Sequence, residues 1–171
     1  LEVLKELGFD RLSIGVQDFD DGILKLINRQ QTAKQVYQVN TMARELGYQS
    51  VNFDLIFGLP RQTEGHITRT MEKVRELRPD RIAFYSYAHV PWIKGLGQRG
   101  YDENDLPKDE EKRELYEVGK QLFDELGYIE IGMDHFALPT DSLYKASINK
   151  TLHRNFMGYT ASKTQVMIGL G

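Results

Sequence analysis

Segments with the pattern of strands alternate with segments with the pattern of helices along most of this chain. VNFDLIF (51–57) is the clearest strand, because its odd-numbered residues form one apolar face and Asn52, Asp54 and Ile56 form the other. Residues 11–17 and 81–90 have the composition of two more strands. Helical spacing of apolar residues predicts three helices: one capped by Thr32 and ended by Gly47, one capped by Thr63 and followed by Pro79, and one over about 108–126.

This alternation is typical of parallel βαβ units. The strands are too few to close a barrel, and the helix-like start at 2–7 implies at least one more strand upstream. We therefore expect an α/β fold, either an open sheet or part of a barrel. Residues 91–107 contain three glycines and two prolines and are predicted to form a long loop. A fourth strand is expected over 128–137 and a short helix near 141–149.

Composition narrows the class of protein. The 171 residues are 40% hydrophobic and 27% charged, as in soluble globular domains, and the formal net charge of −3 argues against nucleic-acid binding. Neither a membrane-length apolar run nor a signal peptide is visible, so we expect a cytoplasmic protein. The chain starts without Met and ends within an apolar segment, which suggests a fragment. Cysteine is absent, which excludes a thiolate metal site within these residues.

Ligands of parallel α/β folds bind beyond the carboxyl ends of the strands. Polar or aromatic groups stand at that end of each predicted strand: Gln17-Asp18, Asp54 before the turn at 58–60, Tyr85 to His89, and Asp134-His135. Their coincidence indicates a polar ligand at one rim. No P-loop, GxSxG or GxGxxG pattern occurs in a strand-to-helix context, and the histidines lack metal-ligand spacing, so we predict no metal site here.

The residues alone leave alternatives open at each position. Asp54, flanked by apolar residues, needs a partner such as Arg29, a backbone amide or ligand hydroxyls, or it serves an internal salt bridge or turn. Asp18 or Asp20 can cap the following helix, and Gln17 points away from Asp18 if the strand pattern persists. The tyrosines at 85 and 87 share one face and either pack in the core or stack on a base.

The order of motifs resembles the oxygen-independent coproporphyrinogen III oxidases, a family of radical S-adenosylmethionine (SAM) enzymes of haem biosynthesis. The resemblance covers almost the whole chain. Its motifs are RLSIGVQDF, LINR, NFDLIFGLP, PDRIAFYSYAHVP, GYIEIGMDHFALP and LHRNFMGYT. Of these, GMDHFA followed by LHRNFMGYT is the most specific to the oxidases, whereas similar relatives bind and deliver haem instead.

The resemblance implies a partial (β/α)6 TIM-like barrel, of which residues 1–137 would form the second half and residues 138–171 the start of a C-terminal extension. It implies two SAM molecules and a [4Fe–4S] cluster bound by a Cys-x-x-x-Cys-x-x-Cys motif upstream of these residues. A 5′-deoxyadenosyl radical would take hydrogen from two propionates of coproporphyrinogen III in turn. Loss of CO₂ and one electron from each would leave the vinyl groups of protoporphyrinogen IX. An external donor, such as a flavodoxin or ferredoxin, would supply electrons.

By motif match, the SAM-contacting positions are Gln17, Arg29, Asp54 and Ala88, with Tyr85 near the adenine. No catalytic residue is assigned. Because the substrate carries four carboxylates, a basic docking surface is expected, and His153 and Arg154 are chemically suited to it. An alternative for both is a charged surface turn.

Overall fold

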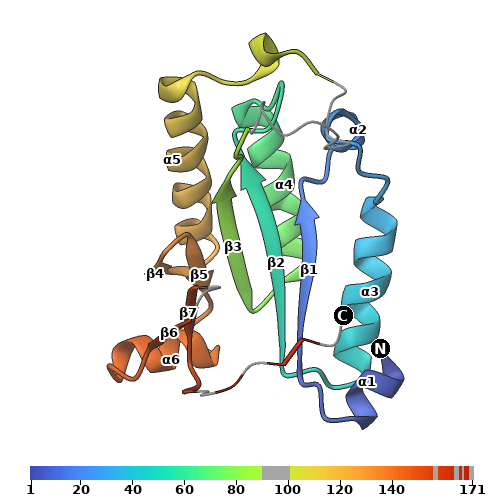
Figure 1. Ribbon diagram of the computed structural model, residues 1–171, viewed down its shortest axis with the longest axis vertical. Coiled ribbons are helices and arrows are strands. Elements are labelled where there is room, and N and C mark those ends of the chain that lie inside the picture. Colours follow the sequence, from blue (N-terminus) through green and yellow to red (C-terminus); the bar gives the residue numbers. More distant parts are fainter. Residues whose placement is uncertain (90–100, 156–157, 164–165, 167, 170–171) are drawn as a thin grey trace.

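The protein is described by a computed structural model, in which residues 1–89, 101–155, 158–163, 166 and 168–169 are placed. Its centre is a five-stranded sheet with strand order β1-β2-β3-β5-β4 (Figure 1). The strands β1 (Arg11–Gln17), β2 (Ser50–Phe57) and β3 (Arg81–Ser86) are parallel, and α3 (Ala33–Glu45) and α4 (Glu64–Leu77) connect them. The predicted βαβαβ order is therefore confirmed.

The remaining elements are shorter or lie outside this repeat. Much of the predicted loop at 91–107 lies outside the described residues, and its described end holds a single 3₁₀ turn. The bounds are α1 (Glu2–Glu6), α2 (Asp21–Leu26), η1 (Glu103–Asp105), α5 (Asp109–Glu125), β4 (Ile129–Gly132), β5 (His135–Ala137), α6 (Ser142–Ile148), β6 (His153–Asn155) and β7 (Gly158–Thr160).

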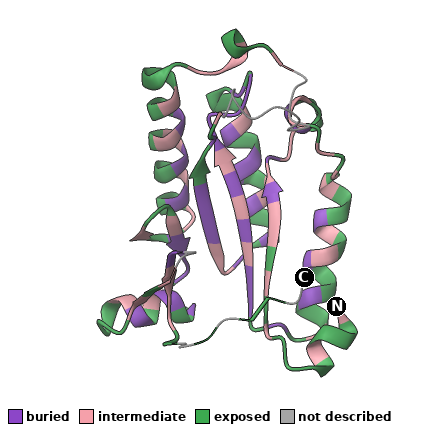
Figure 2. Ribbon diagram, in the orientation of Figure 1, coloured by how far each residue is buried: buried purple, intermediate pink, exposed green. Residues whose placement is uncertain are grey.

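The two faces of the sheet differ in burial. Over residues 51–57 of β2 the odd-numbered residues are buried and the even-numbered ones are partly exposed, as the alternation predicts, whereas Ser50 at the start of the strand is also buried. Figures 1 and 2 show α3, α4 and α5 beside and behind the sheet, with their buried residues turned toward it. Thr32 caps α3 and Thr63 precedes α4 as predicted. The face of the sheet away from these helices therefore presents the polar residues of β1 to β3.

Helix α5 packs unusually close to the sheet at Gly119. A Cβ placed on Gly119 would lie 2.5 Å from the Phe84 ring, and Leu115 and Phe123 are buried on the same side. Helical spacing in the sequence predicts Leu115, Val118, Leu122 and Leu126 on the inner face of this helix. Leu115 is buried as predicted, and the other three are only partly buried against the core. The fully packed positions are instead Gly119 and Phe123, each one residue further along the chain than Val118 and Leu122.

The prediction of one strand over 128–137 is wrong. The segment forms a hairpin, in which β4 and β5 pair antiparallel and β5 pairs antiparallel with β3. Met133 and Asp134 reverse the chain with positive φ angles of 51° and 62°. The sequence hides this turn, because such turns are normally marked by Asn-Gly or Asp-Gly rather than Met-Asp. The predicted helix near 141–149 corresponds to α6.

Residues after 137 are attached to the sheet through Asp141. Its carboxylate accepts hydrogen bonds from Arg81 Nε at 2.6 Å and from Ser50 Oγ at 3.0 Å. The expected domain boundary after residue 137 remains a prediction. None of the described helices is long and apolar enough to cross a membrane.

Candidate functional site

The carboxyl ends of β1, β2 and β3 meet at one edge, at the top of Figure 1. In register, Gln17 stands beside Leu55 and Phe57 beside Ser86. Gln17 ends β1 with a positive φ of 67°, just after the register shifts between Gly15 and Gln17. Because of this register shift, the Gln17 side chain need not point to the face of the sheet that strict alternation along β1 would give it.

Gln17 and Arg29 converge over Gly15. A Cβ built on Gly15 would lie 3.0 Å from both Gln17 Nε2 and Arg29 Nη2, so glycine leaves the space that the two side chains occupy. Arg29 Nη2 donates to the Gly15 carbonyl and to Gln31 Oε1 at 3.2 Å. These contacts bring together two residues that the sequence places twelve positions apart.

Part of this cluster is buried without satisfied hydrogen bonds. Arg29 Nε and Gln31 Nε2 have no hydrogen-bond partner among the described residues. Buried donors without partners are uncommon in folded proteins because they lose solvation. Both are N–H donors, so the cluster is suited to an acceptor such as a carboxylate. Sequence reasoning missed Gln31, although its place two residues after Arg29 was a usable signal.

Asp18 belongs to the turn after β1, and of the two predicted helix caps it is Asp20, not Asp18, that caps α2. It is buried, and its carboxylate accepts from the Asp20 backbone N–H at 2.8 Å, from Gln62 Nε2 at 2.7 Å and from Thr70 Oγ1 at 3.2 Å. Burial raises the pKa of Asp18 above its ordinary value, against the opposing effect of these hydrogen bonds. Asp20 caps α2 by accepting from the Gly22 and Ile23 N–H groups. The network fixes the turn that follows Gln17.

Asp54 lies in the middle of β2 on the polar face. Its carboxylate accepts from Asn52 Nδ2 at 2.7 Å and from Ser13 Oγ at 3.1 Å. Arg29 was one predicted partner, and this alternative is wrong, because Arg29 binds Gly15 and Gln31 instead. Ser13 was missed, although parallel pairing aligns it with Asn52.

Tyr85 and Ala88 extend the site along β3. Tyr85 is 37% exposed, and burial and the charges of Asp54 and Asp134 raise the pKa of its hydroxyl. Ala88 is exposed just after the strand. Tyr87 differs from Tyr85, because it is buried in a small cluster with Ile23 and Leu59.

A cleft of about 480 Å³ runs along the polar face of the sheet. Asp54, Tyr85 and His135 line it toward the middle of the strands, and Arg11 and Arg81 line it where β1 and β3 begin. His153 and Arg154 begin β6, which pairs with β7. The residues that these two strands contribute to the cleft are Asn155, Tyr159 and Thr160. Sequence reasoning missed the two arginines because they stand at the amino ends of their strands.

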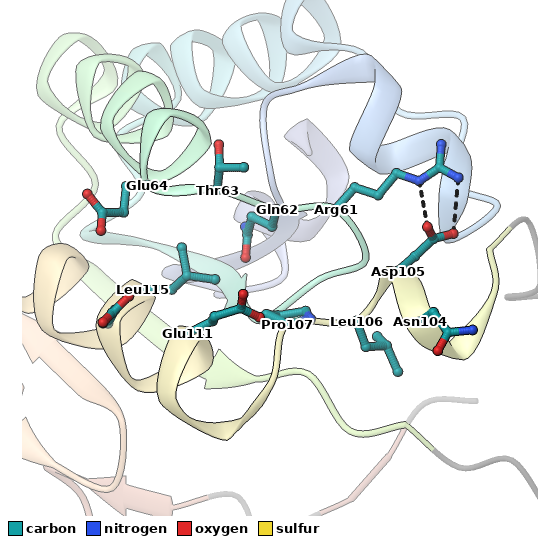
Figure 3. Close-up of a pocket in the computed structure, with 11 residues that line it drawn as sticks. Arg61, Gln62, Thr63, Glu64, Asn104, Asp105, Leu106, Pro107, Glu111 and Leu115 are labelled. Carbon is teal, nitrogen blue, oxygen red and sulfur yellow. Dashed lines mark hydrogen bonds and ion pairs between the residues drawn. The ribbon is translucent and has the colours of Figure 1, made fainter.

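A second cavity of about 300 Å³ lies between the starts of α4 and α5 (Figure 3). Arg61 and Asp105 form an ion pair at its edge, with 2.9 Å between Nε and Oδ1, and hydrogen bonding to Arg61 lowers the pKa of Asp105. Glu64, Glu111 and Glu114 also line it. None of the predicted ligand residues lies there. The described residues contain no grouping of side chains suited to a metal ion.

Comparison with known proteins gives a consistent result. A model of the radical SAM superfamily matches residues 1–74. The chain is 44% identical over 169 residues to the oxygen-independent coproporphyrinogen III oxidase of Pseudomonas aeruginosa, covering 99% of this chain and 36% of that protein. It is 42% identical over 171 residues to the enzyme of the same name from Escherichia coli, covering 100% and 37%.

The fold agrees with a solved relative. The structure of coproporphyrinogen III oxidase from Escherichia coli, described as a radical SAM enzyme, superimposes with a TM-score of 0.87 at 43% identity, over 94% of this chain and 38% of that one. The chain belongs to the oxygen-independent coproporphyrinogen III oxidase family. It spans little more than a third of the length of the curated oxidases that it matches. The fold is accordingly part of a radical SAM barrel.

Proposed function

We propose that the protein acts as an oxygen-independent coproporphyrinogen III oxidase. It would convert two propionates of coproporphyrinogen III to vinyl groups and yield protoporphyrinogen IX, in haem biosynthesis. The observation that carries this proposal is identity of 42–44% along essentially the whole chain to several curated oxidases of this one name. The α/β framework also supports it, since Gln17 at the end of β1 and Arg29 after α2 come together over Gly15.

The Gln17–Arg29 cluster has the chemistry to hold the amino-acid end of SAM. Arg29 can offer its guanidinium to the carboxylate of the cofactor, and its Nε, like Gln31 Nε2, is a buried donor that has no partner among the described residues. The Gln17 amide lies against the same space above Gly15. These residues therefore fit the cofactor on grounds of donor chemistry.

The other matched residues would hold the nucleoside end and the cationic groups. Asp54 has a carboxylate on the polar face that can accept from ribose hydroxyls or an ammonium group. Tyr85 offers a partly exposed ring for the adenine, and Ala88 would contact SAM beside it. The chemistry that bound SAM supplies is removal of a hydrogen atom from a propionate, after which CO₂ and one electron leave.

The remaining components are proposed from the family. These 171 residues contain no cysteine, so the thiolates of a [4Fe–4S] cluster would come from a region upstream of them. Binding of two SAM molecules, reduction by a flavodoxin or ferredoxin, and a cytoplasmic location are further parts of the proposal. The proposal includes no nucleic acid partner and no membrane span.

The test is an anaerobic assay of the intact protein that contains this chain, reconstituted with iron and sulfide. With SAM, a reductant and an electron acceptor, coproporphyrinogen III should yield protoporphyrinogen IX, seen as vinyl products by chromatography. An Arg29→Ala variant should bind less SAM and form less product. Tight haem binding without any vinyl product would instead identify the protein as a haem-delivering relative and refute the oxidase proposal.

A further inference from the structure

His135 has an unusual position in the cleft. It opens β5 opposite Ala83 of β3, and its imidazole stands edge-on to the Tyr85 ring with 5.9 Å between ring centres. The side chain is half-buried and lines the cleft with Asp54. It therefore faces the space beside the proposed cofactor residues without being one of them.

One ring nitrogen of His135 is hydrogen-bonded to the backbone. Nδ1 lies 2.6 Å from the Met133 carbonyl oxygen. A carbonyl oxygen only accepts hydrogen bonds, so Nδ1 must carry the proton in that contact. In the neutral ring, Nε2 is then an acceptor, and among the described residues it has no hydrogen-bond partner.

The turn that orients this ring is strained. Met133 and Asp134 both have positive φ, which side-chain-bearing residues adopt only at a cost. Strained backbone that persists is often associated with a functional position. The strain here coincides with the carbonyl that holds Nδ1.

The antiparallel strand pair β6–β7 also packs against the ring. Gly158 of β7 has a φ of 122°, and a Cβ at that position would lie 3.0 Å from His135 Cε1. Similarly, a Cβ on Gly132 would lie 3.4 Å from the Tyr159 ring. The two glycines thus allow β6–β7 to pack closely against β4–β5 beside the imidazole. The Met133 carbonyl and the backbone at Gly158 therefore limit the movement of the ring.

We propose that His135 is a substrate-binding residue whose Nε2 accepts a hydrogen bond from a pyrrole N–H of the reduced tetrapyrrole. This inference rests on the proposed function, because it takes its ligand from that reaction. Coproporphyrinogen offers four pyrrole N–H donors at its centre and carboxylates at its rim. The substrate therefore brings donors that suit Nε2.

The charges in the cleft favour the N–H groups over a carboxylate as the partner of His135. Asp54 and Asp134 both act on the neighbouring Tyr85 hydroxyl, so a carboxylate placed beside His135 would face two negative charges. The rim carboxylates are better suited to the other end of the cleft. There Arg81 forms an ion pair with Asp141, and Arg11 lies 3.8 Å from the same carboxylate. Two guanidinium groups therefore share one negative charge, which leaves positive charge for a substrate carboxylate.

His135→Asn is the discriminating variant. An Asn amide can donate to the Met133 carbonyl as Nδ1 does, but it places no acceptor at the position of Nε2. In the intact, reconstituted protein, this variant should show a roughly five- to tenfold higher KM for coproporphyrinogen III, the effect of one lost hydrogen bond, with an unchanged SAM Kd. The wild-type protein provides the matched control for substrate turnover.

The inference would be overturned if His135→Asn kept a KM within twofold of wild type while His135→Ala lost substrate turnover. His135 would then only stabilise the turn through its hydrogen bond to Met133. Binding of the tetramethyl ester of coproporphyrinogen III separates the two possible substrate contacts. The Asn variant should weaken ester binding as it weakens acid binding; a loss confined to the acid would overturn the N–H assignment in favour of a carboxylate contact. Absence of turnover in the wild type would refute the proposed function itself.

Discussion

Gly15→Ala should separate the stability of the fold from the binding of SAM. The added Cβ would lie 3.0 Å from Arg29 Nη2 and 3.0 Å from Gln17 Nε2, closer than carbon and nitrogen atoms normally approach. Both contacts are with the ends of flexible side chains, which can swing away without moving the backbone. The strand should therefore persist, while Arg29 and Gln17 lose the arrangement proposed to bind the cofactor.

The size of each effect follows from these contacts. Alanine restricts the unfolded chain more than glycine does, which favours folding by about 0.4–1 kcal/mol where the backbone conformation is compatible. Displacing Arg29 from the cofactor carboxylate would cost a hydrogen bond to a charged group, about 1.5–3 kcal/mol. The SAM Kd should accordingly rise by about 10- to 150-fold, while the melting temperature stays equal or rises.

The assay pairs thermal unfolding with titration calorimetry of SAM, using the intact, reconstituted protein. Gly65→Ala is the matched control, because a Cβ there lies no closer than 3.4 Å to Arg69 and has neither Gln17 nor Arg29 within 4 Å. The control should bind SAM as wild type does. A Gly15→Ala protein that keeps its melting temperature and binds SAM within twofold of wild type would refute the reasoning about this site.

Three further predictions concern other parts of the chain. Gly119→Ala should lower the free energy of unfolding by about 1–3 kcal/mol in denaturant titrations, because its Cβ would overlap the Phe84 ring, whereas Gly65→Ala should not. The pKa of Asp18 is raised above 3.8 in the folded state, so its contribution to stability falls as the pH rises from 3.8 through the folded pKa. The free energy of unfolding of wild type relative to Asp18→Asn should therefore increase as the pH is lowered through that range. A difference between the two proteins that does not change with pH would contradict this. The 171 residues alone should show no [4Fe–4S] absorption after reconstitution, because they contain no cysteine.

The parallel part of the fold could be predicted because its signals are local. Period-two burial in β2 and helical spacing in α4 depend on residues close in sequence, and the helically spaced Ile67, Met71 and Val74 are all buried. The β4–β5 hairpin could not be predicted in the same way. Its turn uses Met133 and Asp134 at positive φ, where Asn-Gly or Asp-Gly is usual, and it is held by pairing of β5 with both β4 and β3.

The sequence by itself determined the alternation of strands and helices, the polar residues at the strand ends, and the motifs that place the chain among the coproporphyrinogen III oxidases. It left open whether the polar residues of GVQDF form a turn or line a ligand site. Tertiary structure assigned Asp18 to a buried network with Gln62 and Thr70, and Gln17 to the space above Gly15. It also paired Asp54 with Ser13 rather than Arg29, and placed His135 in the lining of the cleft. The physical reason is that hydrogen-bond partners and steric room depend on residues 14 to 52 positions apart, which spacing along the chain does not encode.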